Sequence, residues 1–225
     1  MIEIICHDCI AGHDICKMSA LACIDILLEI NIPGVMNFIS HHGYLSHIIE
    51  SLAKSDDALC NTLLNIPENM KYVYVYESKM SVLLRLAKTR SGAELLLSNK
   101  ILDVFSGMKV FDMHPEFKQK KEWFEKNDGE FVPPVDNRYR QILFPALNLC
   151  DCLITTLGTE NYSLISQLMH FLLCHCEMIE IVLRSGSPFS DIGLLQEVAF
   201  VTGLIARIFH PVSLLLYQNL ILLYT

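Results

Sequence analysis

The chain has 225 residues, of which 52% are hydrophobic and 19% charged, with a mean hydropathy of +0.37 and a formal net charge of −8. We expect no direct nucleic-acid binding, because a nucleic-acid binder needs a cationic surface to displace counterions from phosphates. Such an apolar composition is typical either of a membrane protein or of stacked helices that are buried on most sides.

The first candidate site lies near the N-terminus, where Cys6, Cys9, His13 and Cys16 are spaced by three, four and three residues. An unbroken helix would align them on one face, but its 1.5 Å rise per residue would put the outer two about 15 Å apart. Zinc needs all its ligands within about 2.3 Å. A turn at Gly12 could still bring them together, so a zinc site remains an alternative to plain core or surface thiols.

The nine cysteines of the chain are an odd number and lie mostly inside apolar helical patterns. They are therefore interpreted as reduced thiols, which is typical of a cytosolic or nuclear protein. We expect no bound cofactor.

Residues 70–88 carry the clearest helical pattern in the first half of the chain. Residues 72–76 alternate with period two and could form a strand, but they run without a break into an apolar stripe of helical spacing, so a helix is predicted. The stripe consists of Val73, Tyr76, Met80, Leu83, Leu84 and Ala87.

Residues 109–140 differ from the rest, with seven basic and seven acidic residues among 32 positions and a Val132-Pro133-Pro134 run. This composition predicts an exposed excursion between two blocks of one continuous stack. The predicted blocks are residues 1–108 and residues 141–225.

Helical stripes continue through the second block. Residues 138–157 repeat apolar positions at three or four, and after Gly158 a second stripe continues for over five turns. A third follows residues 187–188. The three stripes are Ile142, Ala146, Leu149, Leu153 and Leu157; Ile165, Leu168, Leu172, Cys176, Ile179 and Leu183; and Leu195, Val198, Thr202, Ile205 and Phe209.

Long helices joined by short breaks, with no alternation of strands and helices, predict antiparallel neighbours. Apolar stripes this wide need neighbours on more than one side, as in a stacked solenoid. Since no strict internal repeat is visible, we predict an all-α solenoid of degenerate HEAT-like or armadillo-like character. A compact helical bundle remains the alternative.

The alternative function is a helical membrane protein anchored through residues 198–224. This segment is long enough to cross a bilayer. Arg207 within it would cost about 3 kcal/mol near mid-span, and Pro211 would divide it into two short helices. We therefore expect no transmembrane insertion.

No local signature of catalysis is present: the sequence lacks a G-x-S-x-G elbow, a P-loop and a G-x-G-x-x-G loop. Ser187 precedes Pro188 in the arrangement of an N-cap followed by a proline at the first helical position. Phosphate on Ser187 would meet the positive end of a helix dipole, so Ser187 is a candidate phosphorylation site, with a plain cap as the alternative.

The segments YESKMSVLLRLAKTRSGAELLLSNKILDVFSGMKVFDMHPE (residues 76–116), YRQILFPALNLCDCLITTLG, SLISQLMHFLLCHCEMIEIVLR and LLQEVAFVTGLIARI resemble the C-terminal region of the largest inner-ring scaffold nucleoporins of the nuclear pore complex. The resemblance implies an extended α-solenoid without enzymatic activity, located at the nuclear envelope within the nuclear pore complex of the nucleus.

It also implies partners among other inner-ring scaffold and linker nucleoporins, and a supporting role in nucleocytoplasmic transport of protein and mRNA. No short motif assigns the partner grooves to residues. Family chains are far longer than this one, so the resemblance leads us to expect an incomplete piece of a longer solenoid.

Overall fold

The computed structural model describes residues 1–115, 132–184 and 192–209. Within these ranges the chain is helical throughout and contains no strand. The elements are α1 (Ile2–Ala11), α2 (Asp14–Glu29), α3 (Val35–His41), α4 (Tyr44–Lys54), α5 (Asp56–Leu64), α6 (Lys71–Ala87), α7 (Arg90–Ser98), α8 (Ile101–Gly107), the 3-10 turn η1 (Lys109–Asp112), α9 (Val135–Leu157), α10 (Tyr162–Cys174), α11 (Cys176–Arg184) and α12 (Ile192–Ile208).

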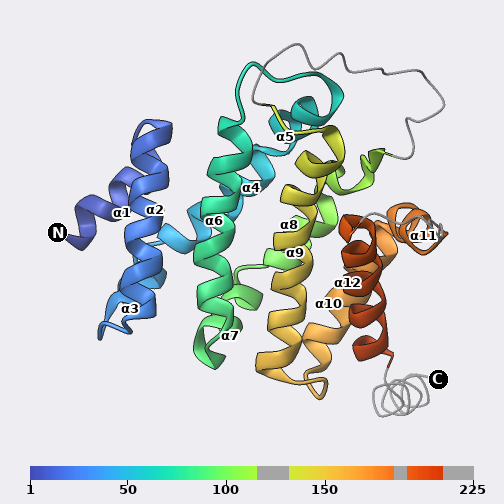
Figure 1. Cartoon of the computed structure of the whole chain (residues 1–225). Helices are drawn as coiled ribbons and strands as arrows, with labels where there is room; N and C mark the ends of the chain where they lie inside the picture. The colour runs from blue at the N-terminus through green and yellow to red at the C-terminus, as the bar shows by residue number, and fades with distance from the viewer. Residues whose placement is uncertain (116–131, 185–191, 210–225) are drawn as a thin grey trace.

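The helices form two layers (Figure 1). In the front layer α2, α6, α9 and α12 lie side by side, each in contact with the next, and all four run from the top to the bottom of the view. The second layer contains α1, α4, α8 and α10, again in successive contact. Helix α10 of the second layer returns upward after α9, so these two helices are antiparallel, whereas the long helices of the front layer all run in the same direction. The predicted all-α solenoid is confirmed.

Helix α6 shows how the sequence produces this arrangement. The predicted stripe faces inward, and Val73, Tyr76, Met80 and Leu83 are at most 1% exposed. The alternating residues 72–76 belong to this helix, which confirms the helical prediction over the strand. An apolar stripe at this spacing must be covered by neighbours, and α2 and α9 cover it from either side.

The short connections depend on a few residues with specific backbone roles. Gly43, between α3 and α4, has φ +75°, a left-handed conformation that glycine adopts without a steric penalty. Thr89 caps α7 by accepting a hydrogen bond from the Gly92 amide. A side chain at Gly92 would overlap the Leu86 carbonyl oxygen, so only glycine lets the chain turn this closely after α6.

The stripe predicted to continue for over five turns after Gly158 is broken at His175, and this part of the prediction is wrong. Helices α10 and α11 meet there at a bend of 73°. His175 is 2% exposed, and its two ring nitrogens lie 2.8 Å from Asp112 Oδ1 and 3.0 Å from the Phe105 carbonyl oxygen. These contacts to residues distant in sequence hold the chain at the bend.

The stripe predicted for α12 is offset from the face that the helix buries, and of its members Val198 and Ile205 are half-buried against the core. Leu195 and Phe209 are exposed at 56% and 43%, whereas the helix buries Glu197, Val201, Leu204 and Ile208. A periodicity that counts only apolar side chains cannot place a charged residue in a core, and Glu197 is the first residue of the face that α12 buries.

Glu197 is buried because its charge is paired on both sides. Arg140 Nε of α9 donates to Glu197 Oε1 at 2.6 Å, and His114 Nε2 lies 3.0 Å from Oε2. Burial acts to raise the pKa of the Glu197 carboxyl, but the hydrogen bonds from His114 and Arg140 outweigh it and leave the pKa below its ordinary value. This cluster fastens α12 to α9 and to the segment after η1.

The predicted excursion at residues 109–140 includes η1 at one end and the start of α9 at the other, while residues 116–131 lie outside the described residues. The division into residues 1–108 and 141–225 stays a prediction. Of the apolar segment 198–224, residues 210–224 are likewise outside the described part. Among the described helices no single one is long and apolar enough to cross a membrane; the bent pair α10–α11 passes that test by length and composition only.

Candidate functional site

The candidate zinc ligands are not brought together. Cys6 and Cys9 point from α1 into the core, whereas Cys16 is exposed on α2 and His13 is the residue before that helix. Burial raises the pKa of the Cys6 thiol to about 11 and that of Cys9 to about 12, which disfavours the thiolate that binds metal. No group of three or more potential ligands in the described ranges could hold a metal ion.

Ser187, the candidate phosphorylation site, lies in residues 185–191, which are outside the described residues. The helix that follows is described from Ile192 onward. The hypothesis of a phosphate at its N-terminus stays a prediction.

An apolar groove of about 510 Å³ lies among α10, α11 and α12. Leu173, Leu183 and Phe209 contribute exposed side chains to it, at 69%, 47% and 43% exposure. Several residues of this groove belong to the stripe that was predicted to continue without a break after Gly158. Because α11 bends away at His175, Cys176, Ile179 and Leu183 line this groove instead of continuing the buried face of α10.

A second hollow, of about 270 Å³, lies among α1, α2, α4, α5 and α6. We call it the lysine pocket. Four lysines line it, and the acidic residue among its lining side chains is Asp14. The lysines are Lys17 of α2, Lys54 of α4, and Lys71 and Lys79 of α6.

Lys79 is the most buried of the four, with 8% of its surface exposed. Its ammonium nitrogen donates to the Ser51 carbonyl oxygen at 3.3 Å. Burial, together with the charge of Lys17, lowers the pKa of Lys79 from 10.5 to about 8. Among the described residues no carboxylate lies within ion-pair distance of Lys79 or Lys17, whereas Lys71 pairs with Asp14 at 3.7 Å.

The sequence reasoning missed this pocket. Lys79 lies between Tyr76 and Leu83 on α6, at the edge of the apolar stripe, and a search for apolar periodicity passes over it. The available signal was its position: a lysine directly before Met80 and three residues after Tyr76 must extend along a buried face. Its meeting with Lys17 depends on the packing of α6 on α2, which the sequence does not show.

Two serine hydroxyls in the wall of the lysine pocket already donate to backbone carbonyl oxygens. The hydroxyls of Ser51 and Ser55 in its wall donate to the carbonyl oxygens of Ile48 and Leu52, at 2.6 and 2.8 Å. Among the described residues, neither hydroxyl is hydrogen bonded to a side chain that could remove its proton, as an activated nucleophile requires. What the pocket offers a ligand is positive charge beside apolar walls.

The sequence was compared with known proteins. The family model described as the nuclear pore complex scaffold, nucleoporins 186/192/205, matches residues 1–209. The nuclear pore complex protein Nup205 of Drosophila melanogaster is 44% identical over 209 residues, which cover 92% of this chain and 10% of the relative. Human Nup205 is 34% identical over 212 residues, covering 94% and 10%. The chain spans about a tenth of the length of these curated relatives.

Proposed function

The chain belongs to the nuclear pore complex scaffold family of nucleoporins 186, 192 and 205, and we propose that it acts as a stiff structural segment of the inner ring of that complex. The observation that carries the proposal is the match of the family model along residues 1–209. The contacts within the helical stack support it, because they join each front-layer helix to the next.

Helix α2 is joined to α6 by a small ionic network. Asp25 accepts hydrogen bonds from the Ser81 hydroxyl and from Arg85 Nε, both at 2.8 Å, and Arg85 also reaches Glu29 at 3.2 Å. A planar guanidinium that contacts two carboxylates fixes orientation as well as distance. The network therefore restricts sliding of α2 along α6.

Hydrogen bonds to backbone carbonyls join α6 to α9 near both ends of their contact. The Tyr76 hydroxyl donates to the Ile142 carbonyl oxygen at 2.9 Å, and the Thr156 hydroxyl to that of Ala87 at 2.7 Å. The next pair, α9 and α12, is joined by Asp151 and Arg207 at 3.0 Å in addition to the Glu197 cluster. Such connections at every step suit a scaffold that must keep its shape while other proteins bind to it.

Within this proposal the segment binds linker nucleoporins and other scaffold nucleoporins, supports nucleocytoplasmic transport through the assembly it helps to build, and performs no catalysis. Its location is then the nuclear pore complex at the nuclear envelope. These statements concern one segment of a long family chain. Of them, the nuclear pore location extends to this protein what its relatives' names say of those relatives.

Imaging tests the proposal. The protein carrying this segment is tagged with a fluorescent protein, and we expect a punctate nuclear rim that coincides with nuclear pores. Lysine-directed crosslinking of purified pores should join exposed residues such as Lys88 to other nucleoporins. A diffuse signal with no crosslinks to nucleoporins would contradict the proposal.

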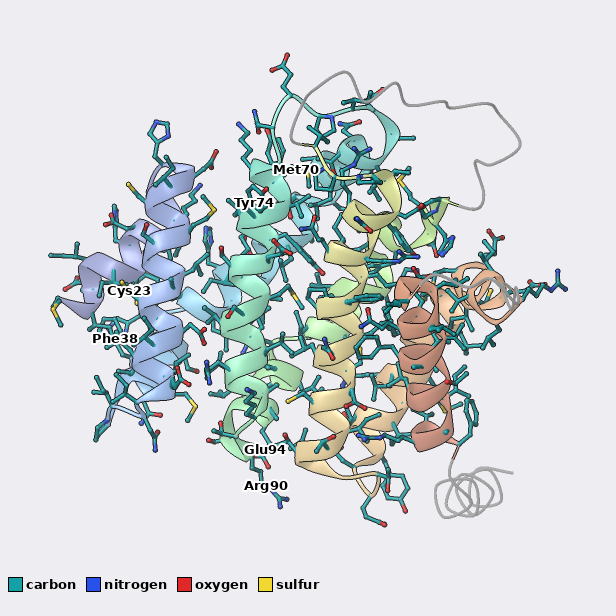
Figure 2. All side chains as sticks on the ribbon, in the orientation of Figure 1. Cys23, Phe38, Met70, Tyr74, Arg90 and Glu94 are labelled. Carbon is teal, nitrogen blue, oxygen red and sulfur yellow. The ribbon has the colours of Figure 1, made fainter. Side chains whose placement is uncertain are left out.

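A matched pair of variants in α6 tests whether the stack itself is needed. Leu83 is fully buried, so Leu83→Asp places a charge in the core, whereas Tyr74 is 45% exposed on the outer side of the same helix (Figure 2). Leu83→Asp should abolish the rim signal and Tyr74→Asp should retain it. If Leu83→Asp also accumulates at the rim, the folded stack is not what places the protein there.

A further inference from the structure

The lysine pocket concentrates positive charge in a chain whose overall charge is negative. The chain carries 17 basic and 25 acidic residues, yet four lysines and one aspartate line this hollow. Two of the lysines have acidic neighbours: Asp14 lies 3.7 Å from Lys71, and Glu50 lies 3.8 Å from Lys54. The positive charge left over belongs to Lys17 and Lys79.

The position of Lys79 is unfavourable unless something binds there. A buried ammonium needs a countercharge or several hydrogen-bond acceptors, and the described residues give it one carbonyl oxygen at 3.3 Å. Lys17 approaches from α2 and adds like charge. Two lysines that line the same hollow and repel each other form a site for an anion, because their mutual repulsion falls when a negative group enters between them.

The rest of the lining decides which kind of anion fits. Ile10, Tyr72 and Val75 give the pocket an apolar wall beside the lysines. A free inorganic anion would use the ammonium groups and leave this wall uncovered. A peptide with an acidic side chain next to an apolar one would use both surfaces.

We propose that the lysine pocket binds an acidic segment of a partner protein, with an Asp or Glu carboxylate against Lys17 and Lys79 and a neighbouring apolar side chain against Ile10, Tyr72 and Val75. The inference rests on the proposed function, since it names where a scaffold segment of this kind receives a partner. Burial and the charge of Lys17 lower the pKa of Lys79, and a carboxylate bound beside it would raise that pKa again.

The test uses the full chain and a defined probe. The probe is a fluorescein-labelled peptide of Glu-Leu pairs separated by Gly-Ser, and its matched control replaces each Glu by Gln. We expect the glutamate peptide to bind at least about tenfold more tightly in fluorescence anisotropy, because a charge-assisted hydrogen bond is worth about 1.5–3 kcal/mol. Equal binding of the two peptides overturns the proposal.

Variants show whether this pocket is the site. Lys79→Met introduces an unbranched side chain one atom shorter and removes the charge, and Lys17→Gln is a second variant that leaves the buried face of α6 intact. Each should weaken the glutamate peptide by about tenfold, while Lys88→Gln, at an exposed lysine at the end of α6, should change it less than twofold. Unchanged binding in both pocket variants overturns the proposal.

The pH dependence gives an independent readout. Affinity for the glutamate peptide should fall as the pH rises through about 8, where Lys79 loses its proton, and Lys79→Met should flatten this dependence. The other titratable groups around the pocket are Cys9, Asp14, Lys17, His47, Lys54, Lys71 and Tyr72. The pKa of Cys9 is raised to about 12, so its thiol stays protonated over this range.

Two further outcomes separate this inference from alternatives. If inorganic phosphate displaces the peptide as effectively as free glutamate peptide does, the pocket is a small-anion site and the peptide assignment is wrong. If the glutamate peptide does not bind while the tagged protein still marks the nuclear rim, the pocket inference fails and the proposed function stands.

Discussion

Glu197 in α12 and Lys79 in α6 are both buried, at 2% and 8% exposure, but their surroundings differ. Glu197 accepts from Arg140 at 2.6 Å and faces His114 at 3.0 Å. Lys79 meets a carbonyl oxygen at 3.3 Å and the positive charge of Lys17. The paired charge joins elements of the stack to one another. Lys79, which has no counterion among the described residues, destabilises the stack locally and can attract a negatively charged group from outside the chain.

The largest effect should come from breaking the paired cluster. Glu197→Ala removes the carboxylate that both Arg140 and His114 contact, and removing one partner of a buried ionic pair costs about 3–5 kcal/mol. We expect the free energy of unfolding in urea to fall by that amount, with the loss of structure beginning at α12.

The pH dependence of the stability loss in Glu197→Ala shows whether lost charge pairing is its cause. Since the pKa of Glu197 is lowered in the folded chain, its ionisation stabilises the fold above the ordinary pKa of a glutamate and the contribution is lost as the pH falls through the lowered value. The difference in stability between the wild type and Glu197→Ala should therefore shrink in acid. A difference that is independent of pH would mean that lost packing, not charge pairing, explains the cost.

Lys79→Met should act in the opposite direction and stabilise the fold at pH 7. A pKa lowered from 10.5 to about 8 corresponds to a penalty of about 3 kcal/mol, and losing the hydrogen bond to Ser51 costs about 1 kcal/mol. The net gain is then about 2 kcal/mol.

The direction in which this stability difference changes with pH follows from proton binding at Lys79. Between pH 8 and 10.5 the unfolded chain binds a proton at Lys79 that the folded chain has released, so the stability of the wild type rises with pH relative to the variant. Urea unfolding of both proteins at pH 7 and pH 9.5 measures the difference, which should narrow at the higher pH. A variant less stable than the wild type at pH 7 would show that Lys79 is not a strained charge.

Tyr139→Phe separates hydrogen bonding from charge in the region around Glu197. The Tyr139 hydroxyl donates to the Phe111 carbonyl oxygen at 2.6 Å. The residue is 1% exposed, and its ring packs edge-on against the His114 ring. Removing a neutral buried donor costs about 1 kcal/mol. Thermal unfolding should show this smaller loss, and Tyr162→Phe, at 45% exposure, is the matched control without effect. A loss as large as that of Glu197→Ala would mean that the two residues act as one network.

The parts of the fold that sequence reasoning predicted share one property: their helices bury apolar stripes that need no distant partner to be recognised. Helices α6 and α9 fall where predicted because apolar residues such as Tyr76, Met80, Ile142 and Leu149 recur at helical spacing along their inner faces. The parts it missed depend on polar contacts across the stack. His175 ends α10 through contacts with residues 63 and 70 positions earlier, and Glu197 enters the core through Arg140.

The lysine pocket was missed for the same reason. Each of its lysines looks ordinary in the sequence, and their convergence depends on the packing of α2, α4 and α6. The candidate zinc ligands show the reverse: their spacing stands out in the sequence, but α1 buries two of them and α2 exposes another. A local pattern identifies residue types, and tertiary packing decides which of them meet.

The smallest effect is expected where charge is paired but not buried. Arg90 and Glu94 form an i,i+4 pair at 3.2 Å on α7, with 78% and 58% of their side chains exposed at the lower end of the molecule (Figure 2). Solvent screens such pairs, and ordering two long side chains offsets the attraction, so Glu94→Gln should change the free energy of unfolding by about 0.3 kcal/mol.

Glu197→Ala and Glu94→Gln both remove one carboxylate that pairs with arginine, yet they should differ about tenfold in cost because only one of the two pairs is shielded from water. Urea unfolding of both variants in one buffer measures that ratio. Similar costs would mean that pairing itself, and not burial, sets how strongly a charge holds these helices together. The burial of Lys79 would then give no reason to expect that it binds an anion more strongly than an exposed lysine does.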